Sequence, residues 1–227
     1  VSIMPCTAKK YESKRPEMSV NGHHQDVDAV LTTRELGRMI RQAGIDFGQL
    51  PEETYDAPFG ITSGAAAIFG VSGGVMEAAL RTVYEKVTGK TLQKIDFYSI
   101  RGMGGIKEAE VDLDGLKVNV AVTHTLTNAA TILNKIRAGN CKYHFIEVMA
   151  CPGGCIGGGG QPYRTTNDLR LKRVASTYQV DRTLPIRKSH ENPAVAELYK
   201  HYLLKPLGEK SHHLLHTHYT DKSNSRH

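Results

Sequence analysis

The sequence predicts an α/β fold, with a mostly parallel sheet flanked by helices and a C-terminal helical tail. Strand-like and helix-like segments alternate between residues 26 and 150, which is typical of α/β layers. The apolar segment YHFIEVMA (143–150) leads directly into the glycine-rich loop CPGGCIGGGGQ, and open α/β sheets bind ligands at the carboxyl ends of their strands. From about residue 162 the pattern becomes polar and helical. The 227 residues, 40% of them hydrophobic, are enough for a sizeable core.

The first elements are a strand and two helices. Residues 26–44 (DVDAVLTTRELGRMIRQAG) predict a short strand followed by a helix, with Thr32 and Glu35 as a capping box and Gly44 at its end. Residues 60–90 predict a glycine-rich loop and then a helix that ends at Gly89. The apolar stripe of that second helix is formed by Met76, Ala79, Leu80, Val83 and Val87.

The next elements are strands around one helix. Residues 94–100 (KIDFYSI) are rich in β-formers, and residues 108–124 carry Asp114-Gly115 between two alternating segments, a strong hairpin signal. Residues 127–139 predict a helix capped by Thr127 or Asn128. Residues 143–150 predict an apolar strand. The segment 163–227 is predicted to wrap around the main body as helices.

Composition narrows the function classes. No apolar run approaches the roughly 20 residues of a membrane helix, and no secretory signal opens the chain, which predicts a cytoplasmic protein and leaves a periplasmic location open. The net charge is +6, but Lys and Arg are scattered rather than gathered in a stripe, so nucleic-acid binding is not predicted. The histidines of SHHLLHTHY match no familiar metal spacing. Four cysteines, two inside a glycine run, favour a metal or redox site.

Cys151 and Cys155 form a C-x3-C pair. Thiolates suit zinc, copper or iron–sulfur clusters, and spacing alone does not choose among them. A structural zinc is less favoured because no C-x2-C knuckle is present. The glycines favour a bulky cluster, since residues without Cβ let the backbone approach it closely. The alternative is a flexible loop with two ordinary thiols.

A second cysteine motif lies in IMPCTAKKYESKRPEM, where Cys6 follows a stiffening proline and Lys9 offers an ammonium group to an anion. The loop ITSGAAAIFGVSGGVME is a third glycine-rich turn before a helix, but it lacks the Gly-Lys-Ser/Thr ending of a phosphate loop. Cys141 precedes a strand and is predicted to be a structural thiol rather than a ligand.

These motifs together resemble the catalytic domain of the iron-only (FeFe) hydrogenases. MPCTAKK with the downstream Arg-Pro-Glu-Met is similar to one signature of that family, and EVMACPGGCIGGGGQP is similar to another. FGVSGGVMEAALR and RGMGGIKEAEV also resemble family segments, and the tail through LYKHYLLKPLGEKSHHLLHTHY resembles the small-subunit region. The resemblance implies two parts: residues 1–162, the C-terminal part of the large-subunit catalytic domain, and residues 163–227, a small-subunit-like helical tail.

The resemblance also implies the chemistry. The family carries the H-cluster, a 4Fe-4S cubane joined through a cysteine sulfur to a two-iron subsite, and interconverts H2 with protons and electrons. By resemblance the cubane ligands are Cys6, Cys151 and Cys155, with Cys155 the bridge to the two-iron subsite. Lys9 would hydrogen-bond a cyanide ligand. The residues implied to line the cofactor pocket are Met4, Pro5, Phe69 and Met149.

The chain also departs from the family pattern. The signature with adjacent cysteines, which supplies a fourth cubane ligand, is absent, so we expect a partial catalytic domain that is inactive alone and works in a longer chain or complex. The electron-transfer partner, ferredoxin or NAD(P)-linked subunits, is expected to act through the missing N-terminal region. Thr125 stands where the family has glycine. Two alternatives stay open: a non-catalytic relative in iron–sulfur assembly or H2 sensing, and one subunit of a split enzyme.

Overall fold

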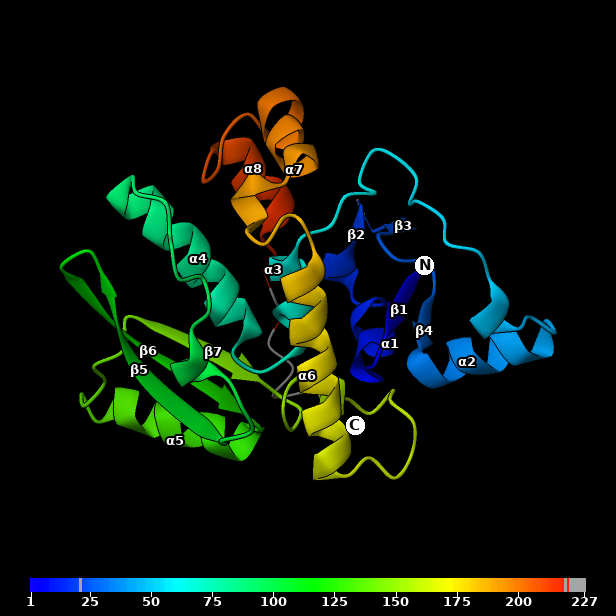
Figure 1. The fold of residues 1–227 in the computed structure, drawn as a ribbon, viewed down its shortest axis with the longest axis horizontal. Helices are drawn as coiled ribbons and strands as arrows, with labels where there is room; N and C mark the ends of the chain where they lie inside the picture. The colour runs from blue at the N-terminus through cyan, green and yellow to red at the C-terminus, as the bar shows by residue number, and fades with distance from the viewer. Residues whose placement is uncertain (21, 219, 221–227) are drawn as a thin grey trace.

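A two-stranded parallel sheet organises the N-terminal lobe, residues 1–49, in the computed structural model, which describes residues 1–20, 22–218 and 220 (Figure 1). In it β1 (Ser2–Met4) pairs with β4 (Val30–Thr32), and α2 (Thr33–Gln42) follows β4 directly. The predicted capping box is confirmed, because the Thr32 hydroxyl accepts the Glu35 N–H and the Glu35 carboxylate accepts the Thr32 N–H. The other elements of this lobe are α1 (Ala8–Glu12), the 3-10 turns Pro16–Met18 and Phe47–Gln49, and the antiparallel pair β2 (Ser19–Val20) and β3 (His24–Gln25).

A three-stranded sheet forms the second lobe, residues 74–149, in the order β5 (Ile106–Leu113), β6 (Leu116–His124), β7 (Phe145–Met149). β5 and β6 form the predicted hairpin: Leu113 pairs with Leu116, and Asp114 and Gly115 between them have positive φ angles of 60° and 94°. β6 and β7 pair in parallel.

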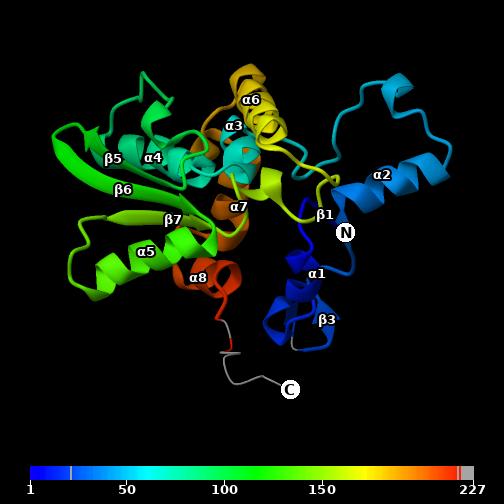
Figure 2. The same ribbon diagram turned by 90° about the horizontal axis from the view of Figure 1, so that it is seen from below.

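Two helices cover the two faces of this sheet, α4 (Gly74–Thr88) on one and α5 (Leu126–Arg137) on the other (Figure 2). Because β6 lies between them, its last five residues are all buried. The hydrophobic core lies between α4 and the sheet and contains Met76, Leu80, Ile100, Val111, Leu113, Val120 and Val122.

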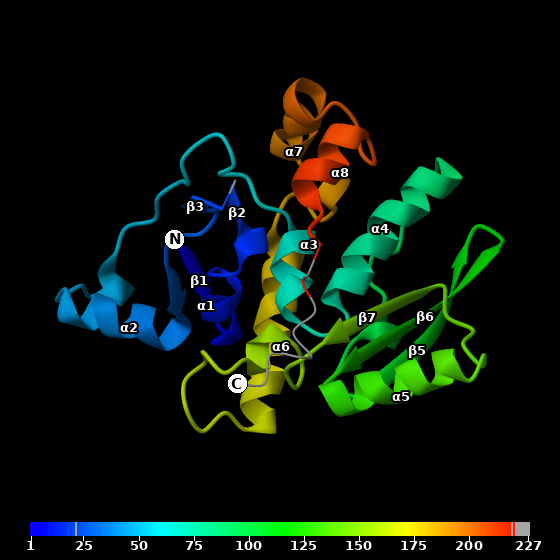
Figure 3. The ribbon, with the colours of Figure 1, turned by 180° about the vertical axis from the view of Figure 1, so that it is seen from behind.

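The helices α3 (Gly64–Ala67) and α6 (Asn167–Thr183) lie between the two lobes (Figures 1 and 3). The short C-terminal helices α7 (Pro193–Leu198) and α8 (Glu209–Leu215) lie at one end of this pair. α3 and α6 pack closely, since a Cβ on Gly64 would come 2.1 Å from the Asp181 carboxylate. The remaining elements are the 3-10 turns Ile68–Gly70, Tyr98–Ile100, Cys155–Gly157 and Ser189–Glu191, and a π-helical turn Tyr199–Leu203. Of the tail predicted to run from 163 to 227, residues 219 and 221–227 lie outside the described residues.

The α/β class is confirmed, but the strands are divided among three sheets rather than joined in one. Of the four strand pairings in the described residues, two are parallel and two antiparallel. The expected strand at 94–100 is wrong, because this segment forms the 3-10 turn Tyr98–Ile100 instead. Asp96 and Arg101 pair across the turn at 2.6 Å, and Ile100 is fully buried against α4.

A buried ion network joins α4 to α6. The Arg81 guanidinium binds both carboxylate oxygens of Asp181, at 2.8 and 2.9 Å, and the Glu77 carboxylate at 2.7 Å, and all three side chains have no exposed surface. Burial by itself lowers the pKa of Arg81, but the Asp181 and Glu77 carboxylates outweigh it and raise that pKa. Arg101 and Arg187 extend the network to Asp96. The helical tail is therefore attached to the second lobe through charges that are removed from water.

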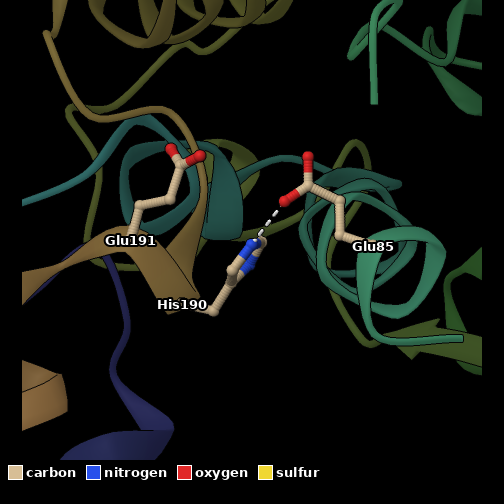
Figure 4. Close-up of side chains that lie close together, drawn as sticks. All are labelled: Glu85, His190 and Glu191. Atoms are coloured by element: carbon tan, nitrogen blue, oxygen red, sulfur yellow. Dashed lines mark hydrogen bonds and ion pairs between the residues drawn. The ribbon is translucent and has the colours of Figure 1, made fainter. Parts of the chain in front are cut away.

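A second polar cluster connects α4 with the turn Ser189–Glu191 (Figure 4). His190 points at Glu85, with its Nε2 at 2.7 Å from the carboxylate and its Nδ1 at 3.1 Å from the Thr82 hydroxyl. Glu85, His190 and Glu191 bring possible metal-ligand atoms within 4.8 Å of one another. The Lys188 ammonium already bonds both carboxylates, Glu85 at 2.6 Å and Glu191 at 3.0 Å. We therefore interpret the cluster as an ion-pair contact that holds the tail on α4.

We expect this contact to make the fold sensitive to acid. Hydrogen bonds from Lys188 and from the Leu92 N–H lower the pKa of Glu85 from its ordinary value of 4.5 to about 2, against the opposing effect of burial. Because the folded-state pKa is depressed, the stabilisation is complete above pH 4.5 and is lost as pH falls toward 2. The loss should be roughly 2 kcal/mol after allowance for solvent screening. Urea unfolding from pH 6 to 2 should show a weaker pH dependence in Glu85→Gln, and equal dependence in both proteins would contradict this.

Thr125 holds a backbone conformation that suits glycine. It precedes α5 with φ 71° and ψ 145°, and its side chain makes no capping bond. The predicted cap at Thr127 or Asn128 is therefore wrong: α5 begins at Leu126, and the Asn128 amide donates to the His124 carbonyl at 2.8 Å. The Thr125 N–H donates to the Met149 carbonyl at 2.8 Å, which ties this turn to the end of β7.

Thr125→Gly should therefore raise the stability of the chain. Glycine enters this region without steric cost, and the gain should outweigh its larger unfolded-state entropy by about 1 kcal/mol. Urea unfolding measures the change. The matched control is Thr127→Gly, two residues on in the first turn of α5, which should destabilise by roughly 0.5 kcal/mol. A Thr125→Gly protein less stable than wild type would show that the backbone strain is not significant.

Candidate metal centre

The first cysteine of the candidate site follows the short parallel pairing of β1 with β4. β1 aligns Met4 with Thr32 of β4, and the chain then passes through Pro5 and Cys6 into α1. The Lys10 ammonium donates to the Val30 carbonyl at 2.7 Å, which fixes α1 against the same strand. Cys6 is half-buried. Because its backbone is bounded by a paired strand and a docked helix, its position is well defined.

The other two cysteines lie on the loop after β7. Cys151 follows Met149 by two residues, and Cys155 begins the 3-10 turn Cys155–Gly157. Between them Gly153 and Gly154 have positive φ angles of 78° and 98°, which L-residues rarely adopt. The Gly154 N–H donates to the Cys151 carbonyl at 3.0 Å. These glycines let the chain fold back so that both half-buried thiols belong to one tight turn.

The glycine run 157–160 packs directly on the segment that carries Cys6. The Gly160 N–H donates to the Pro5 carbonyl at 3.1 Å. A Cβ on Gly160 would lie 2.5 Å from the Cys6 nitrogen, and one on Gly158 would lie 1.9 Å from the Pro5 oxygen. Both approaches are to backbone atoms, so side chains cannot be accommodated at either position. The glycines thus have a structural reason: they bring the two cysteine segments into contact.

Electrostatics places the predicted residues in one group. The pKa of the Cys155 thiol is raised, first by burial and then by the neighbouring Cys151 and Cys6 sulfurs. The Lys9 ammonium acts in the opposite direction and lowers that pKa, so this cation faces the thiols. Lys9 also forms an ion pair with Glu12, one helical turn on. A buried thiol with two further sulfurs and a cation beside it forms a donor set that suits a metal cluster, because metal binding stabilises thiolates.

The structure also locates the implied lining residues. The Met149 sulfur would lie 2.8 Å from a Cβ on Gly154, and the Met4 carbonyl 3.0 Å from one on Gly160, so both border the cysteine loop. Met4 and Lys9 also line a cavity of about 370 Å³. Phe69 is 47% exposed in the turn Ile68–Gly70, beside the Gly70 carbonyl that approaches Gly154. Cys141 lies before β7, at the opposite end of that strand from Cys151.

Sequence reasoning missed the residues that hold the loop. The Arg34 guanidinium of α2 donates to the Gly159 carbonyl at 2.7 Å and to the Gln161 carbonyl. These hydrogen bonds attach the glycine run to α2. The Ser72 N–H donates to the Gly153 carbonyl at 3.0 Å, between the two cysteines. Glu147 could have been singled out from the sequence, because it is the single acidic residue in the apolar strand FIEVM. A buried carboxylate needs hydrogen-bond donors, so this position indicates a structural contact.

The comparisons with known proteins agree with this geometry. Residues 1–159 match the family described as "Iron only hydrogenase large subunit, C-terminal domain". Residues 167–222 match the family described as "Iron hydrogenase small subunit". The chain belongs to the iron-only hydrogenase family. The resemblance predicted from the sequence motifs is thereby confirmed.

Named relatives of this iron-only hydrogenase chain are longer proteins. The NADP-reducing hydrogenase subunit HndD of Solidesulfovibrio fructosivorans is 56% identical over 96% of the chain and 37% of its own length. Iron hydrogenase 1 of Clostridium pasteurianum is 45% identical over 96% of the chain and 39% of its own length. The cytosolic iron–sulfur assembly component 3 of Rattus norvegicus is 33% identical over 99% of the chain and 48% of its own length. The hydrogenase relatives are therefore nearer than the assembly protein.

Solved structures give the same result. A [FeFe]-hydrogenase studied for oxygen inactivation of its H cluster 2Fe subcluster matches with a TM-score of 0.78 and 43% identity, over 96% of this chain and 61% of that one. A variant of the [FeFe]-hydrogenase HydA1 from Chlamydomonas reinhardtii matches with a TM-score of 0.78 over 62% of its length. The chain thus spans about two fifths of these hydrogenase relatives and three fifths of these structures. None of the helices in the described part of the chain is long and apolar enough to cross a membrane.

Proposed function

We propose that this chain supplies the C-terminal part of a hydrogenase catalytic domain that oxidises H2 and reduces protons reversibly. The observation that carries the proposal is the contact of the glycine run with Pro5 and Cys6, which gathers three cysteines at one place. In the proposal residues 1–162 are the large-subunit part and residues 163–227 the small-subunit-like tail.

Three thiolates would hold the metal centre. Cys6, Cys151 and Cys155 would ligate a 4Fe-4S cubane, and Cys155 would bridge it to the two-iron subsite. When bound, this H-cluster supplies the redox chemistry that interconverts H2 with protons and electrons. Because burial and its two neighbouring thiols raise the pKa of Cys155, binding should release protons and weaken as pH falls.

The remaining residues would act by charge and by excluding water. The Lys9 ammonium, held by Glu12, would donate a hydrogen bond to an anionic ligand of the two-iron subsite. Met4, Pro5, Phe69 and Met149 would form an apolar wall, which limits solvent access and so tunes the redox potential. The exposed Phe69 is the least enclosed of these in the described structure.

The activity, substrates and partners belong to the longer protein in this proposal. Ferredoxin or NAD(P)-linked subunits would exchange electrons through an N-terminal region, and the relative named as NADP-reducing supports the second kind. Cysteine usage favours a reducing cytoplasmic compartment, while a relative named as periplasmic keeps that compartment open.

The experiment is anaerobic reconstitution of the chain with ferrous iron and sulfide, followed by iron and acid-labile sulfide analysis. Bound iron should fall in Cys151→Ser and stay unchanged in the matched control Cys141→Ser. Equal iron in both variants would contradict the proposed site.

A second experiment uses a longer protein that contains this chain together with an N-terminal region. After maturation, that longer protein should show CO and cyanide infrared bands and H2 evolution, and we expect neither from the chain alone. Iron without such bands in the longer protein would instead favour an iron–sulfur assembly role, which the 33% identical assembly relative keeps in view.

A further inference from the structure

Two opposite charges stand on one face of the second-lobe sheet, beside its hydrophobic core. Val122 of β6 pairs with Lys107 of β5 on one side and with Glu147 of β7 on the other, so the three side chains share a row and a face. That face is covered by α4, and Lys107 and Glu147 are only 9% and 6% exposed. Burying charges is costly unless they are hydrogen-bonded, so their partners indicate their role.

Both charges bind backbone groups at the start of α4 or in the turn before it. The Glu147 carboxylate accepts the N–H groups of Gly73 and Met76, at 2.6 and 2.7 Å, and so caps the helix. The Lys107 ammonium donates to the Ser72 carbonyl at 3.0 Å, to the Ser72 hydroxyl at 3.4 Å, and to the Gly102 carbonyl at 2.9 Å. A helix cap explains Glu147 alone, whereas Lys107 contributes nothing to the cap. Its hydrogen bonds instead join Ser72 to the Gly102 backbone.

Ser72 in turn contacts the loop between the two cysteines. It is fully buried, and its N–H donates to the Gly153 carbonyl at 3.0 Å. A Cβ on Gly154 would lie 2.7 Å from the Ser72 nitrogen and 2.9 Å from the Gly70 carbonyl, so the loop is wedged against residues 70–72. The position of this backbone therefore sets the position of Gly153 and Gly154, and with it the distance between Cys151 and Cys155.

We propose that Lys107, supported by Glu147, is a positioning residue that holds the Cys151–Cys155 loop in its cluster-binding conformation through Ser72. Burial lowers the pKa of Lys107 to about 8, and the Glu147 charge opposes this, so the ammonium is retained near neutral pH. Arg101, which adjoins Gly102, directs its guanidinium away to Glu77 and Asp96. That this loop conformation binds a cluster rests on the proposed function. The rigidity of the loop can be measured without iron.

The test compares alkylation rates of the individual thiols in the iron-free folded chain by peptide mass spectrometry. In Lys107→Met, Cys151 and Cys155 should react roughly tenfold faster, because alkylation rates rise with the population of the locally opened loop. Lys107→Met removes a positive charge, a change that cannot favour thiolates, so any gain in rate reflects a loosened loop. Cys141, at the far end of β7, serves as the internal reference.

Lys107→Arg should restore the wild-type rates, and Lys117→Met, which removes an exposed lysine of the same sheet, should leave them unchanged. A folded Lys107→Met protein with wild-type rates at Cys151 and Cys155 overturns the proposal. If that variant unfolds, which Cys141 would report, Glu147→Gln supplies the same comparison, and unchanged rates there overturn it equally. Because no iron is present, this result is distinguishable from a failure of the chain to bind a cluster.

Discussion

Gly158→Ala should abolish most iron binding while the rest of the chain stays folded. The added Cβ would lie 1.9 Å from the Pro5 oxygen and 3.0 Å from the Cys155 oxygen. Both neighbours are backbone atoms, so the strain cannot be relieved by turning a side chain. The segment that carries Cys6 must move away from the loop, and a metal site requires its ligands within about 0.5 Å of their positions. We expect iron affinity to fall roughly 100-fold.

Iron and sulfide content after anaerobic reconstitution measures this effect, with far-ultraviolet circular dichroism as the test of folding. The matched control is Gly37→Ala, on α2, where a Cβ meets no atom within 4 Å and the helix gains propensity. The contact between the glycine run and Pro5 would not hold the site together if both alanine variants bound iron as wild type does.

The local elements were largely predictable from the sequence because their signals are local. The Thr32–Glu35 capping box and the Asp114-Gly115 hairpin depend on residues within one turn, and both are confirmed. The arrangement of the strands was not predictable, since alternation of apolar residues indicates the faces of a strand but not its partner. The strand expected at 94–100 was wrong because Asp96 pairs both with Arg101, across a local turn, and with Arg187, which is distant in the sequence.

The candidate site was predictable in its residues but not in its support. The cysteines and glycines stand out as motifs, and the family they indicated is confirmed. What could not be seen is why each glycine is needed, because the Gly158 and Gly160 contacts are with a segment near the start of the chain. The roles of Ser72 and Lys107 likewise depend on backbone hydrogen bonds, which leave no trace in residue type.

Arg81→Met should produce the largest loss of stability among these variants. The guanidinium is fully buried and binds Asp181 and Glu77, and it also donates to the carbonyls of Ile95 and Arg187 at 3.0 and 2.9 Å. Its removal leaves two carboxylates buried with fewer partners, and breaking such a pair costs about 3–5 kcal/mol. Urea unfolding at pH 7 should show this loss as a lower midpoint.

The same network predicts which part of the chain separates first. Asp181 lies on α6 and Arg81 on α4, so losing their pairing removes a fully buried charged contact between the tail and the second lobe. Limited proteolysis of Arg81→Met should therefore release the tail, whereas Arg182→Met, which removes an exposed contact on α6, should change the stability by less than about 0.5 kcal/mol. If Arg81→Met and Arg182→Met unfolded at the same urea concentration, the buried charges would not be what attaches the tail. The double variant Arg81→Met/Asp181→Leu should be more stable than Arg81→Met alone. Well-packed apolar residues can replace a buried ion pair, whereas removing one partner leaves the other charge buried without its counter-ion.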